Sequence, residues 1–342
     1  MTPKPTLMRQ EICEIPNAVD RLLTNGGPAV QQAVSLARET DPRFLLSVAR
    51  GSSDHACTYL KYASEILLGL PMASVGPSVR SVYGADIAAE GGFCLAVSQS
   101  GQSPDIVSMT RSICASGAPT LAITNDPASP LAQVANVTLP IHAGPEVSVA
   151  ATKTFVTSAV AGLWLLAEWK GDTELVAAIN ALPGHLAQAT DCDWSVAADA
   201  LSDSSVYMLG RGPSWAIANE AALKFKETCR IHAESYSSAE VQHGPVSIIA
   251  PDFPVIALAA GDAAEVSVAD VADTLADKGA RVFATTEHVA RAIPLPHVRT
   301  DHWLTDPLSL VVSFYAMVEA VAVARGIDPD APQRLKKVTE TL

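Results

Sequence analysis

The chain contains one pattern twice, an apolar strand followed by an Arg-Gly-x-Ser turn and a helix. The first copy is FLLSVARGSSDHACTYLKYAS, residues 44–64, and the second is VYMLGRGPSWAIANEAALKFKE, residues 206–227. Around both copies, short apolar runs alternate with longer segments of helical spacing, which is the order of β-α-β units in a parallel sheet. The repeat therefore predicts an α/β protein built by internal duplication, with one sheet in each half.

The pattern also predicts where the elements and the domains lie. In the first half we expect strands at 44–49, 73–75, 93–97, 120–124 and 137–141 and helices at 55–68, 104–116 and 148–169. In the second half we expect strands at 206–209, 255–259 and 282–285 and helices at 214–228 and 307–325. A polar, turn-rich passage separates the halves. The predicted domains are 1–195, which includes a helical lead-in at 1–40, then 196–325, and a tail at 326–342.

Composition limits the possible classes of partner. The 342 residues are 49% hydrophobic and 17% charged, which is typical of a globular protein and excludes a disordered chain. The net charge of -13 and the lack of a basic stripe argue against nucleic acid. A small phosphorylated metabolite remains compatible, because one local pocket binds a phosphate whatever the global charge.

Cysteine usage and hydropathy point to a reduced compartment. The cysteines have no C-x-x-C spacing and are expected to be free thiols in a cytoplasmic protein. We expect no signal peptide at the N-terminus and no membrane span, because the longest apolar stretch, 308–324, is short and is interrupted by Glu319. The cysteines are Cys13, Cys57, Cys94, Cys114, Cys192 and Cys229.

Two serine-rich loops follow strands of the first half. SQSGQS, residues 98–103, follows the strand at 93–97, and Gly51-Ser52-Ser53 follows the strand at 44–49. Backbone N–H groups and hydroxyls at a helix N-terminus attract a phosphate, and open α/β sheets bind ligands beyond the carboxyl ends of their strands. The alternative is that Ser103 is an ordinary helix cap before Pro104. A third segment, GPEVSVAATKTF at 144–155, offers the Val149 backbone and Thr152, or is simply another helix cap.

The second half contributes acids and bases. Glu220, Lys224 and Glu227 stand at i, i+4 and i+7 of a predicted helix, so Lys224 is placed to pair with either carboxylate. Such a face is either a salt-bridged surface stripe or, because it follows a turn at a strand end, one wall of a cleft. His243, in a His-Gly-Pro loop, is a candidate functional histidine, with a structural hydrogen bond as the alternative. The polar tail is either a frayed end or a segment that folds back over the site and delivers Lys336 or Lys337.

Several of these motifs stand together in a recognisable order. They are the GSS turn, AVSQSGQS, VAATKTF, EAALKFKET followed by IHAES, the run from Glu240 to Pro245, and DPDAPQRLKK. Together they resemble the sugar isomerase (SIS) family, in particular the isomerase half of the glutamine:fructose-6-phosphate amidotransferases and the related stand-alone deaminases. The resemblance extends from about residue 40 to the C-terminus. It implies two tandem SIS domains, each a five-stranded parallel sheet between helices, a flavodoxin-like αβα sandwich.

The resemblance also implies roles for individual residues. Glu227 corresponds to the carboxylate that transfers the proton, His243 to the histidine that opens the sugar ring, and Lys337 to the tail lysine that closes over the open-chain sugar. In the family the histidine loop enters the site of the neighbouring subunit, which implies a homodimer. The implied ligands of the phosphate and sugar are Gly51, Ser52, Ser53, Ser98, Gln99, Ser100, Ser103, Val149, Thr152 and Lys224.

Three positions depart from the amidotransferase pattern. Ala151 stands where those enzymes have serine, Gln102-Ser103 replaces Glu-Thr, and Lys336 precedes Lys337, which leaves the tail lysine uncertain by one position. We also expect no glutaminase half, because the first cysteine is Cys13 and does not follow the initiator Met.

The sequence thus predicts an enzyme that converts glucosamine 6-phosphate and water to fructose 6-phosphate and ammonium. Glu227 works best with a raised pKa, which burial favours and Lys224 opposes. No metal or other cofactor is expected, because the histidines and carboxylates lack a ligand spacing such as H-E-x-x-H. The alternatives are a deaminase or deglycase for another amino-sugar or fructosamine 6-phosphate, an ammonia-dependent isomerase subunit, and a non-catalytic phosphosugar sensor. The C4 epimer, the physiological direction, an effector and assembly beyond a dimer stay open.

Overall fold

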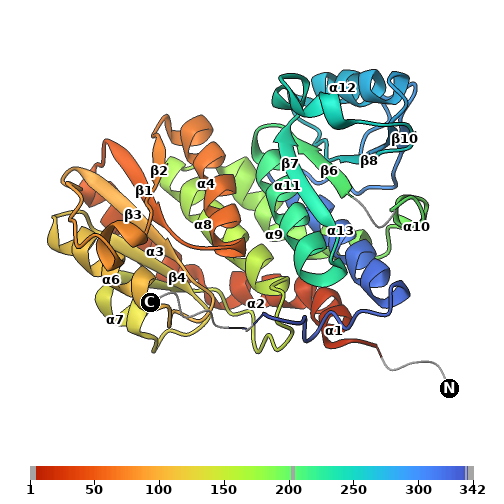
Figure 1. Cartoon of the computed structure of the whole chain (residues 1–342). Coiled ribbons are helices and arrows are strands. Elements are labelled where there is room, and N and C mark those ends of the chain that lie inside the picture. The colour runs from red at the N-terminus through yellow and green to blue at the C-terminus, as the bar shows by residue number, and fades with distance from the viewer. Residues whose placement is uncertain (1–4, 202–204, 336, 338–342) are drawn as a thin grey trace. The chain divides into compact units, whose positions relative to one another are not determined.

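The chain forms two compact units, shown in the ribbon view of Figure 1. The computed structural model describes residues 5–201, 205–335 and 337. Unit 1 comprises Met1–Pro16, Val147–Thr152 and Ala181–Leu335. Unit 2 comprises Asn17–Glu146, Lys153–Asn180 and Lys336–Leu342. Each unit contains one parallel sheet of five strands, which confirms the predicted α/β fold with one sheet in each half.

Unit 2 contains the sheet of the first half, in the order β2-β1-β3-β4-β5. Its strands are β1 (Phe44–Val48), β2 (Met72–Ser74), β3 (Gly92–Val97), β4 (Thr120–Thr124) and β5 (Val137–Pro140). Its helices are α3 (Gly27–Thr40), α4 (Ser52–Leu68), α5 (Ser78–Ser81), α6 (Pro104–Ala115), α7 (Pro130–Val134) and α8 (Lys153–Lys170). All five strands predicted for this half are present. Every residue of β3 and β4 is buried, as expected for central strands covered on both faces.

Helices cover both faces of this sheet. The buried side chains of α6 and α7 form one hydrophobic core with alternate residues of β1, β3 and β4. On the opposite face α4 and α8 pack together and α3 lies beside α8 (Figure 1). Gly162 of α8 makes this close approach possible, because a Cβ at that position would lie 2.3 Å from the side chain of Leu60. The result is a three-layer αβα sandwich.

Unit 1 contains the second sheet, in the order β10-β9-β8-β6-β7. Its strands are β6 (Ser205–Gly210), β7 (His232–Ser237), β8 (Pro254–Ala257), β9 (Arg281–Ala284) and β10 (Ile293–Pro294). Its helices include α1 (Leu7–Cys13), α10 (Ser195–Ala198), α11 (Pro213–Lys224), α12 (Glu265–Asp277) and α13 (Asp306–Ala324). Three single-turn segments are η1 (Phe225–Cys229, a π-helix), η2 (Glu240–Gln242) and η3 (Pro245–Ile248). Two longer helices, α2 (Ile15–Asn25) and α9 (Thr173–Ala189), run from one unit into the other.

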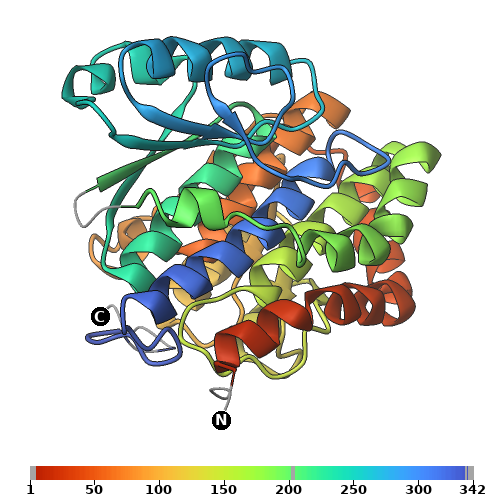
Figure 2. The same ribbon diagram turned by 90° about the vertical axis from the view of Figure 1, so that its right-hand side faces the viewer.

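The layers of unit 1 repeat those of unit 2. The apolar face of α12 packs on Tyr207, Val255 and Val282 of the sheet, and α11 and α13 lie on the other side (Figure 2). Numbered from the strand that precedes the Arg-Gly turn, the two sheets have the same order, because β6, β7, β8, β9 and β10 take the places of β1, β2, β3, β4 and β5. The internal duplication expected from the two Arg-Gly-x-Ser turns is therefore present in the topology.

Helix α13 is long and apolar enough to cross a membrane, but 83% of its apolar window is buried inside the protein. It packs against α1, α10 and α11, all within unit 1. Burial of this kind is typical of a core helix in a globular protein.

The division of the chain differs from a simple boundary at residue 195. The lead-in is split, because Thr6 and Arg9 bond to Glu319 of α13 (2.7 and 2.8 Å), which holds the first residues in unit 1. Residues 147–152 and the second half of α9 also belong to unit 1. The helix expected at 148–169 accordingly begins only at Lys153.

The expectations from the sequence lacked two strands, β7 and β10, and several helices, of which the longest are α9 and α12. Strand β7, HAESYS, is a polar edge strand with mostly half-buried side chains, so it lacks the apolar run by which the other strands were recognised. Strand β10 is two residues long and also lies at an edge. Edge strands are held by main-chain pairing with one neighbour, which leaves little trace in the sequence.

Candidate functional site

The two serine loops lie where a sheet of this order binds ligands. Strands β1 and β3 are neighbours, while β2 lies on the other side of β1, so the chain reverses its direction of travel across the sheet between them. The loops that follow β1 and β3 therefore diverge at a topological switch point at the carboxyl ends of the strands, which is where open α/β sheets bind ligands. Both loops belong to unit 2.

The SQSGQS loop is fixed by its own hydrogen bonds. The Gly101 N–H donates to Ser98 Oγ (3.2 Å) and the Gln102 N–H to Ser100 Oγ (3.3 Å). The carbonyl of Gln99 accepts the N–H of Asn125 from the loop after β4 (3.1 Å). Gly101 has φ 61°, and a Cβ there would lie 2.2 Å from Ser129 Oγ, so this position requires glycine. The loop is thus held in one conformation by the protein itself.

Ser103 occupies the N-cap position of α6, as the alternative interpretation required. Its hydroxyl, however, makes no capping hydrogen bond to the helix. An N-cap serine normally satisfies one of the free N–H groups of the first turn. The Ser103 hydroxyl therefore keeps hydrogen-bonding capacity for a ligand, whereas the Ile106 N–H of the first turn already donates to Asp105 Oδ1 (2.8 Å).

Arg50 connects the two loops, a feature that the sequence reasoning did not single out. Its Nε donates to Asp105 Oδ2 (2.6 Å), and its Nη2 lies 2.5 Å from the same oxygen. Asp105 stands in the first turn of α6 and its side chain is completely buried. The Arg-Gly-x-Ser pattern was visible in the sequence, but nothing in it showed that a carboxylate 55 positions away would meet the arginine.

Unit 1 contains Glu220, Lys224 and Glu227, which form a group of charged side chains that we call the Glu-Lys-Glu cluster. Lys224 Nζ lies 3.2 Å from Glu220 Oε1 and 2.5 Å from Glu227 Oε2, so Lys224, which was expected to pair with either carboxylate, pairs with both. Glu220 and Lys224 are fully buried, whereas 22% of the Glu227 side chain is exposed. Tyr315 of α13 donates to Glu220 Oε1 (2.9 Å). The cluster is therefore a buried ion network with one exposed carboxylate, and the surface-stripe interpretation is wrong.

Electrostatics keep Lys224 charged. Burial by itself lowers the pKa of Lys224, but the carboxylates of Glu220 and Glu227 raise it by more, so the net shift is upward. Glu227 lies in the π-helix η1, which continues α11 and ends at Arg230 in a left-handed conformation (φ 55°). Single π turns are frequent at functional sites, because they change the direction of a side chain within a helix.

His243 lies in the exposed loop between η2 and η3. The side chain is exposed, and within the described part of the chain no hydrogen bond holds its ring. The backbone around it is fixed, because the His243 N–H donates to the Glu240 carbonyl (2.9 Å) and the Tyr207 hydroxyl to the Pro245 carbonyl (3.1 Å). The alternative of a structural histidine therefore has no hydrogen bond in its favour. His232, at the start of β7, lies 3.3 Å from Ser205 Oγ.

The tail lysine has a partner within unit 2. Lys337 Nζ donates to Glu146 Oε2 (2.9 Å), and Glu146 is buried and also accepts the Thr154 hydroxyl (2.6 Å). The alternative, Lys336, lies outside the described residues.

The remaining predicted residues, Val149 and Thr152, belong to unit 1 with Glu227 rather than to unit 2 with the serines. The Val149 N–H donates to the Asp330 carbonyl (3.1 Å), so its N–H is already engaged by the chain. Thr152 is completely buried. Unit 1 thus holds Val149, Thr152, Lys224, Glu227 and His243, and unit 2 holds Gly51, Ser52, Ser53, Ser98, Gln99, Ser100, Ser103 and Lys337.

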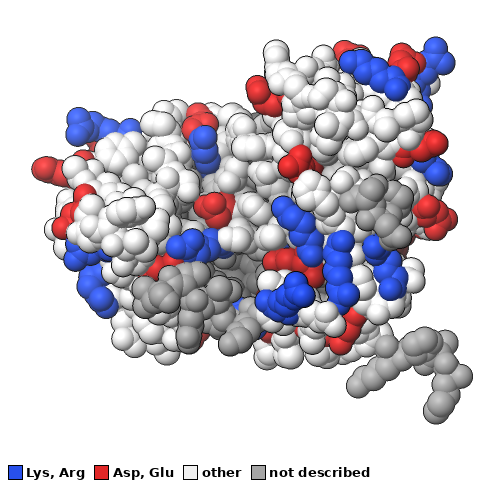
Figure 3. Space-filling model, in the orientation of Figure 1, with Lys and Arg blue, Asp and Glu red and all other residues white. Residues whose placement is uncertain are grey.

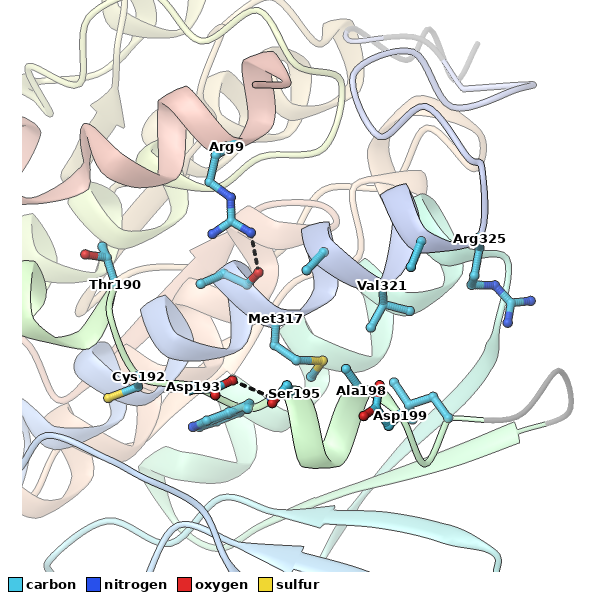
Figure 4. Close-up of a pocket in the computed structure, with 15 residues that line it drawn as sticks. Arg9, Thr190, Cys192, Asp193, Ser195, Ala198, Asp199, Met317, Val321 and Arg325 are labelled. Atoms are coloured by element: carbon cyan, nitrogen blue, oxygen red, sulfur yellow. Dashed lines mark hydrogen bonds between the residues drawn. The ribbon is translucent and has the colours of Figure 1, made fainter. Parts of the chain in front are cut away.

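None of these residues lines the cavity of about 490 Å³ that unit 1 contains (Figure 4). Its floor is the apolar face of α13 around Met317 and Val321, and Arg9 lies at its rim. The guanidinium of Arg9 is already bonded to Glu319 and to the Ala316 carbonyl (2.8 and 2.7 Å). The cavity is a weaker candidate than the serine loops, because the guanidinium groups of Arg9 and Arg325 that line it already bond to protein groups.

Charge and metal-binding groups add two observations. Acidic and basic side chains are intermingled on the face shown in Figure 3. Among the residues that the structure describes, no group of three or more His, Cys, Asp and Glu side chains is arranged to hold a metal ion.

Comparison with known proteins places this geometry in a family. The SIS domain model matches residues 40–168 and 201–323. The isomerizing glutamine–fructose-6-phosphate aminotransferase of Symbiobacterium thermophilum is 34% identical over 360 residues, which cover 96% of this chain and 58% of that protein. That of Aeropyrum pernix is 33% identical, over 97% of this chain and 57% of its own length. The chain therefore spans less than two thirds of the curated relatives that it matches.

Solved structures agree with this assignment. A Silicibacter pomeroyi protein assigned as a phosphosugar isomerase, without a named substrate, is 62% identical with a TM-score of 0.92, over 95% of this chain and 100% of that one. The C-terminal domain of glucosamine-fructose-6-phosphate aminotransferase from Francisella tularensis is 25% identical with a TM-score of 0.85, over 96% and 98%. Glucosamine-6-phosphate deaminase from Thermotoga maritima shares the fold (TM-score 0.79, 19% identity, over 98% and 100%).

Proposed function

Because the chain belongs to the SIS family, we propose that it is a phosphosugar aldose-ketose isomerase that deaminates its substrate. The proposed reaction converts glucosamine 6-phosphate and water to fructose 6-phosphate and ammonium. The observation that carries the proposal is the Glu-Lys-Glu cluster, in which a buried lysine fixes one partly exposed carboxylate, Glu227. A positioned carboxylate is the group that a C2-to-C1 proton transfer needs. The similarity to aminotransferases and to a deaminase fold agrees with an amino-sugar phosphate as substrate.

In the proposed mechanism the phosphate is bound by the serine loops of unit 2. His243 protonates the ring oxygen and the sugar opens to its aldehyde. Glu227 then removes the proton from C2, the electrons of that C–H bond form the C1=C2 double bond of the enolamine, and the electrons of the C1=O bond move to O1, which takes a proton from the C2 ammonium group. The proton on Glu227 returns to C1 while the nitrogen lone pair forms the C2=N bond, which leaves an imine at C2 and a hydroxyl at C1. Water adds to the imine carbon and the nitrogen leaves as ammonium. This direction consumes only water besides the sugar phosphate.

Lys337 is proposed to act on the intermediate. It would stabilise the developing enolate charge and shield it from solvent, or form an imine with the ketose. Its hydrogen bond to the buried Glu146 supports a fixed position for its ammonium group. No cofactor or metal takes part in the proposed steps.

The proposed assembly is a homodimer in which the His243 loop completes the site of the neighbouring subunit. Two exposed features of this loop support an interface, the free ring of His243 and the side chain of Ile248, which is 57% exposed. An exposed aliphatic side chain close to His243 in the sequence is better accommodated by a protein partner than by water. We place the enzyme in the cytoplasm, where the six free cysteines stay reduced.

The decisive experiment measures ammonium release by the purified protein over a panel of hexosamine and fructosamine 6-phosphates. Highest kcat/KM with glucosamine 6-phosphate, with fructose 6-phosphate as the second product, supports the proposal. Preference for galactosamine 6-phosphate or for a fructosamine 6-phosphate would reassign the substrate. Turnover only from fructose 6-phosphate and free ammonium would indicate an isomerase subunit, and binding without turnover would indicate a sensor.

The dimer is tested by mixing two inactive variants, Glu227→Gln and His243→Ala. If Glu227 and His243 of one site come from different subunits, each mixed dimer contains one intact site, and random mixing restores about a quarter of the wild-type activity. If both residues act in the same subunit, the mixture stays inactive.

A further inference from the structure

Arg50 lies at the point where a bound phosphate would be held. It follows β1 directly after Ala49 and precedes Gly51, which has φ 54° and is the N-cap of α4. Its ion pair with Asp105 joins this loop to the first turn of α6, two residues beyond Ser103. The arginine therefore bridges both serine loops at the switch point of the sheet.

The geometry of the pair uses only part of the guanidinium. Nε and Nη2 both meet the same oxygen of Asp105, Oδ2, at 2.6 and 2.5 Å. Within the described part of the chain Nη1 has no hydrogen-bond partner, and 45% of the Arg50 side chain is exposed. A guanidinium has five N–H donors in a planar fork, so the end that carries Nη1 remains available for two oxygens of a ligand.

The charges favour an anion at this end. The hydroxyls of the SQSGQS loop are neutral, and the protein has a net charge of -13, so a phosphate needs a nearby cation to offset the loss of its hydration. Without Arg50, the buried carboxylate of Asp105 would lose this ion pair, and its negative charge would repel the phosphate. Arg50 thus neutralises this carboxylate and offers new donors in the same position.

We propose that Arg50 is a phosphate-contacting residue of this site and that Asp105 is the positioning residue that aims its guanidinium. This inference rests on the proposed function in one respect, that the ligand carries a phosphate group. It does not depend on which reaction the protein catalyses. Arg–phosphate pairs with two parallel N–H···O bonds are among the strongest charge-assisted hydrogen bonds, so the contribution to affinity is large.

The test measures binding of inorganic phosphate by calorimetry and steady-state kinetics with the best substrate of the panel. Arg50→Met is expected to weaken phosphate binding and raise KM by about tenfold or more, with a smaller change in kcat. The matched control is Arg111→Met, which removes an exposed arginine of α6 that makes no hydrogen bond within the described residues, and it should leave phosphate affinity unchanged. Asp105→Asn should weaken phosphate binding less than Arg50→Met, because the guanidinium stays but loses its orientation.

A folded Arg50→Met protein that binds phosphate like the wild type would overturn the proposal and leave a merely structural ion pair. If Arg50→Met does not fold, Arg50→Lys keeps a charge opposite Asp105 but loses the planar fork, and it should bind phosphate about fivefold more weakly. Unchanged affinity in that variant also overturns the proposal. Loss of phosphate binding in a protein that turns over no amino sugar would refute the proposed reaction and keep this inference. Absence of phosphate binding in the wild type refutes the inference whatever the reaction.

Discussion

The two sheets have the same strand order, but their equivalent edges have opposite roles. In unit 2 the loop after β3 is SQSGQS, and the Ser103 hydroxyl makes no capping bond there. In unit 1 the corresponding loop after β8 is closed by the chain itself, because the N–H of Gly261 donates to Asp306 Oδ2 (2.7 Å). In unit 1 the side chain of Asp306 thus accepts the hydrogen bond of the Gly261 N–H. The corresponding loop of unit 2 is rich in serine.

Arg299 completes the closure in unit 1. Its guanidinium bonds to the Ala259 carbonyl (2.9 Å) and lies 2.5 Å from Glu265 and 3.2 Å from Asp306. All its hydrogen-bond partners are protein groups, whereas Arg50 in unit 2 is paired with one carboxylate and is 45% exposed. The edge of unit 2 thus has a partly exposed arginine and a serine-rich loop, whereas the corresponding edge of unit 1 is closed by Arg299 and Asp306, and the Glu-Lys-Glu cluster lies on α11 and η1, which follow β6.

The largest expected effect concerns the acid-base residue of unit 1. Glu227→Gln should lower kcat by about a thousandfold, because the amide cannot accept the C2 proton, while sugar-phosphate affinity changes little. Ammonium-release kinetics and calorimetry measure the two effects. Glu234→Gln, in an acid of β7 that bonds Tyr236 (2.6 Å), is the matched control and should retain activity. A Glu227→Gln enzyme with substantial turnover would remove the proton-transfer assignment.

The closed edge should matter for stability and not for binding. Asp306→Ala leaves the N–H of Gly261 without its partner and removes one of the two carboxylates that pair with Arg299. It should lower the free energy of unfolding by about 2 kcal/mol, less than for a fully buried pair because Arg299 is partly exposed. Urea denaturation measures the change, and Asp301→Ala, in an exposed aspartate nearby in sequence, is the control. An increase in KM for the sugar phosphate after Asp306→Ala would contradict the expectation that the loop after β8 has no role in substrate binding.

The serine loop of unit 2 should matter for substrate binding and little for stability. Ser98→Ala or Ser100→Ala should raise KM by about tenfold with kcat nearly unchanged, because phosphate contacts act in the ground state and the transition state alike. The free energy of unfolding should fall by only about 1 kcal/mol, because each variant loses one hydrogen bond within the loop. If either substitution lowers kcat alone, the loop takes part in the chemistry and is not a simple anchor.

The smallest effect concerns pH. The pKa of Lys224 is raised in the folded protein, so its stabilising contribution is fully present below about pH 10, the usual range for a lysine, and is lost only as the pH rises through the raised value. The difference in unfolding free energy between the wild type and Lys224→Met should therefore stay constant from pH 7 to about pH 10. Urea titrations at several pH values measure it. A decline that begins near neutral pH would mean that Lys224 loses its proton there, contrary to the cluster described here.

Much of the fold could be read from apolar runs and turns. Strands β3 and β4 could be predicted because central, fully buried strands have continuous apolar sequences. The pairing of Lys224 with a carboxylate could be predicted from helical spacing. Strand β7 was missed because it is polar and half-exposed. The burial of the Glu-Lys-Glu cluster could not be predicted either, since the same spacing occurs on exposed helices.

The sequence by itself determined the duplicated α/β architecture, the position of the serine loops at strand ends and the family, because these depend on local patterns of apolar, glycine and serine residues. Tertiary structure alone decided that Arg50 meets Asp105, that Asp306 closes the second edge, and that residues 147–152 belong with the C-terminal sheet. These arrangements depend on side chains distant in the chain, which are brought together only when the sheets and helices pack.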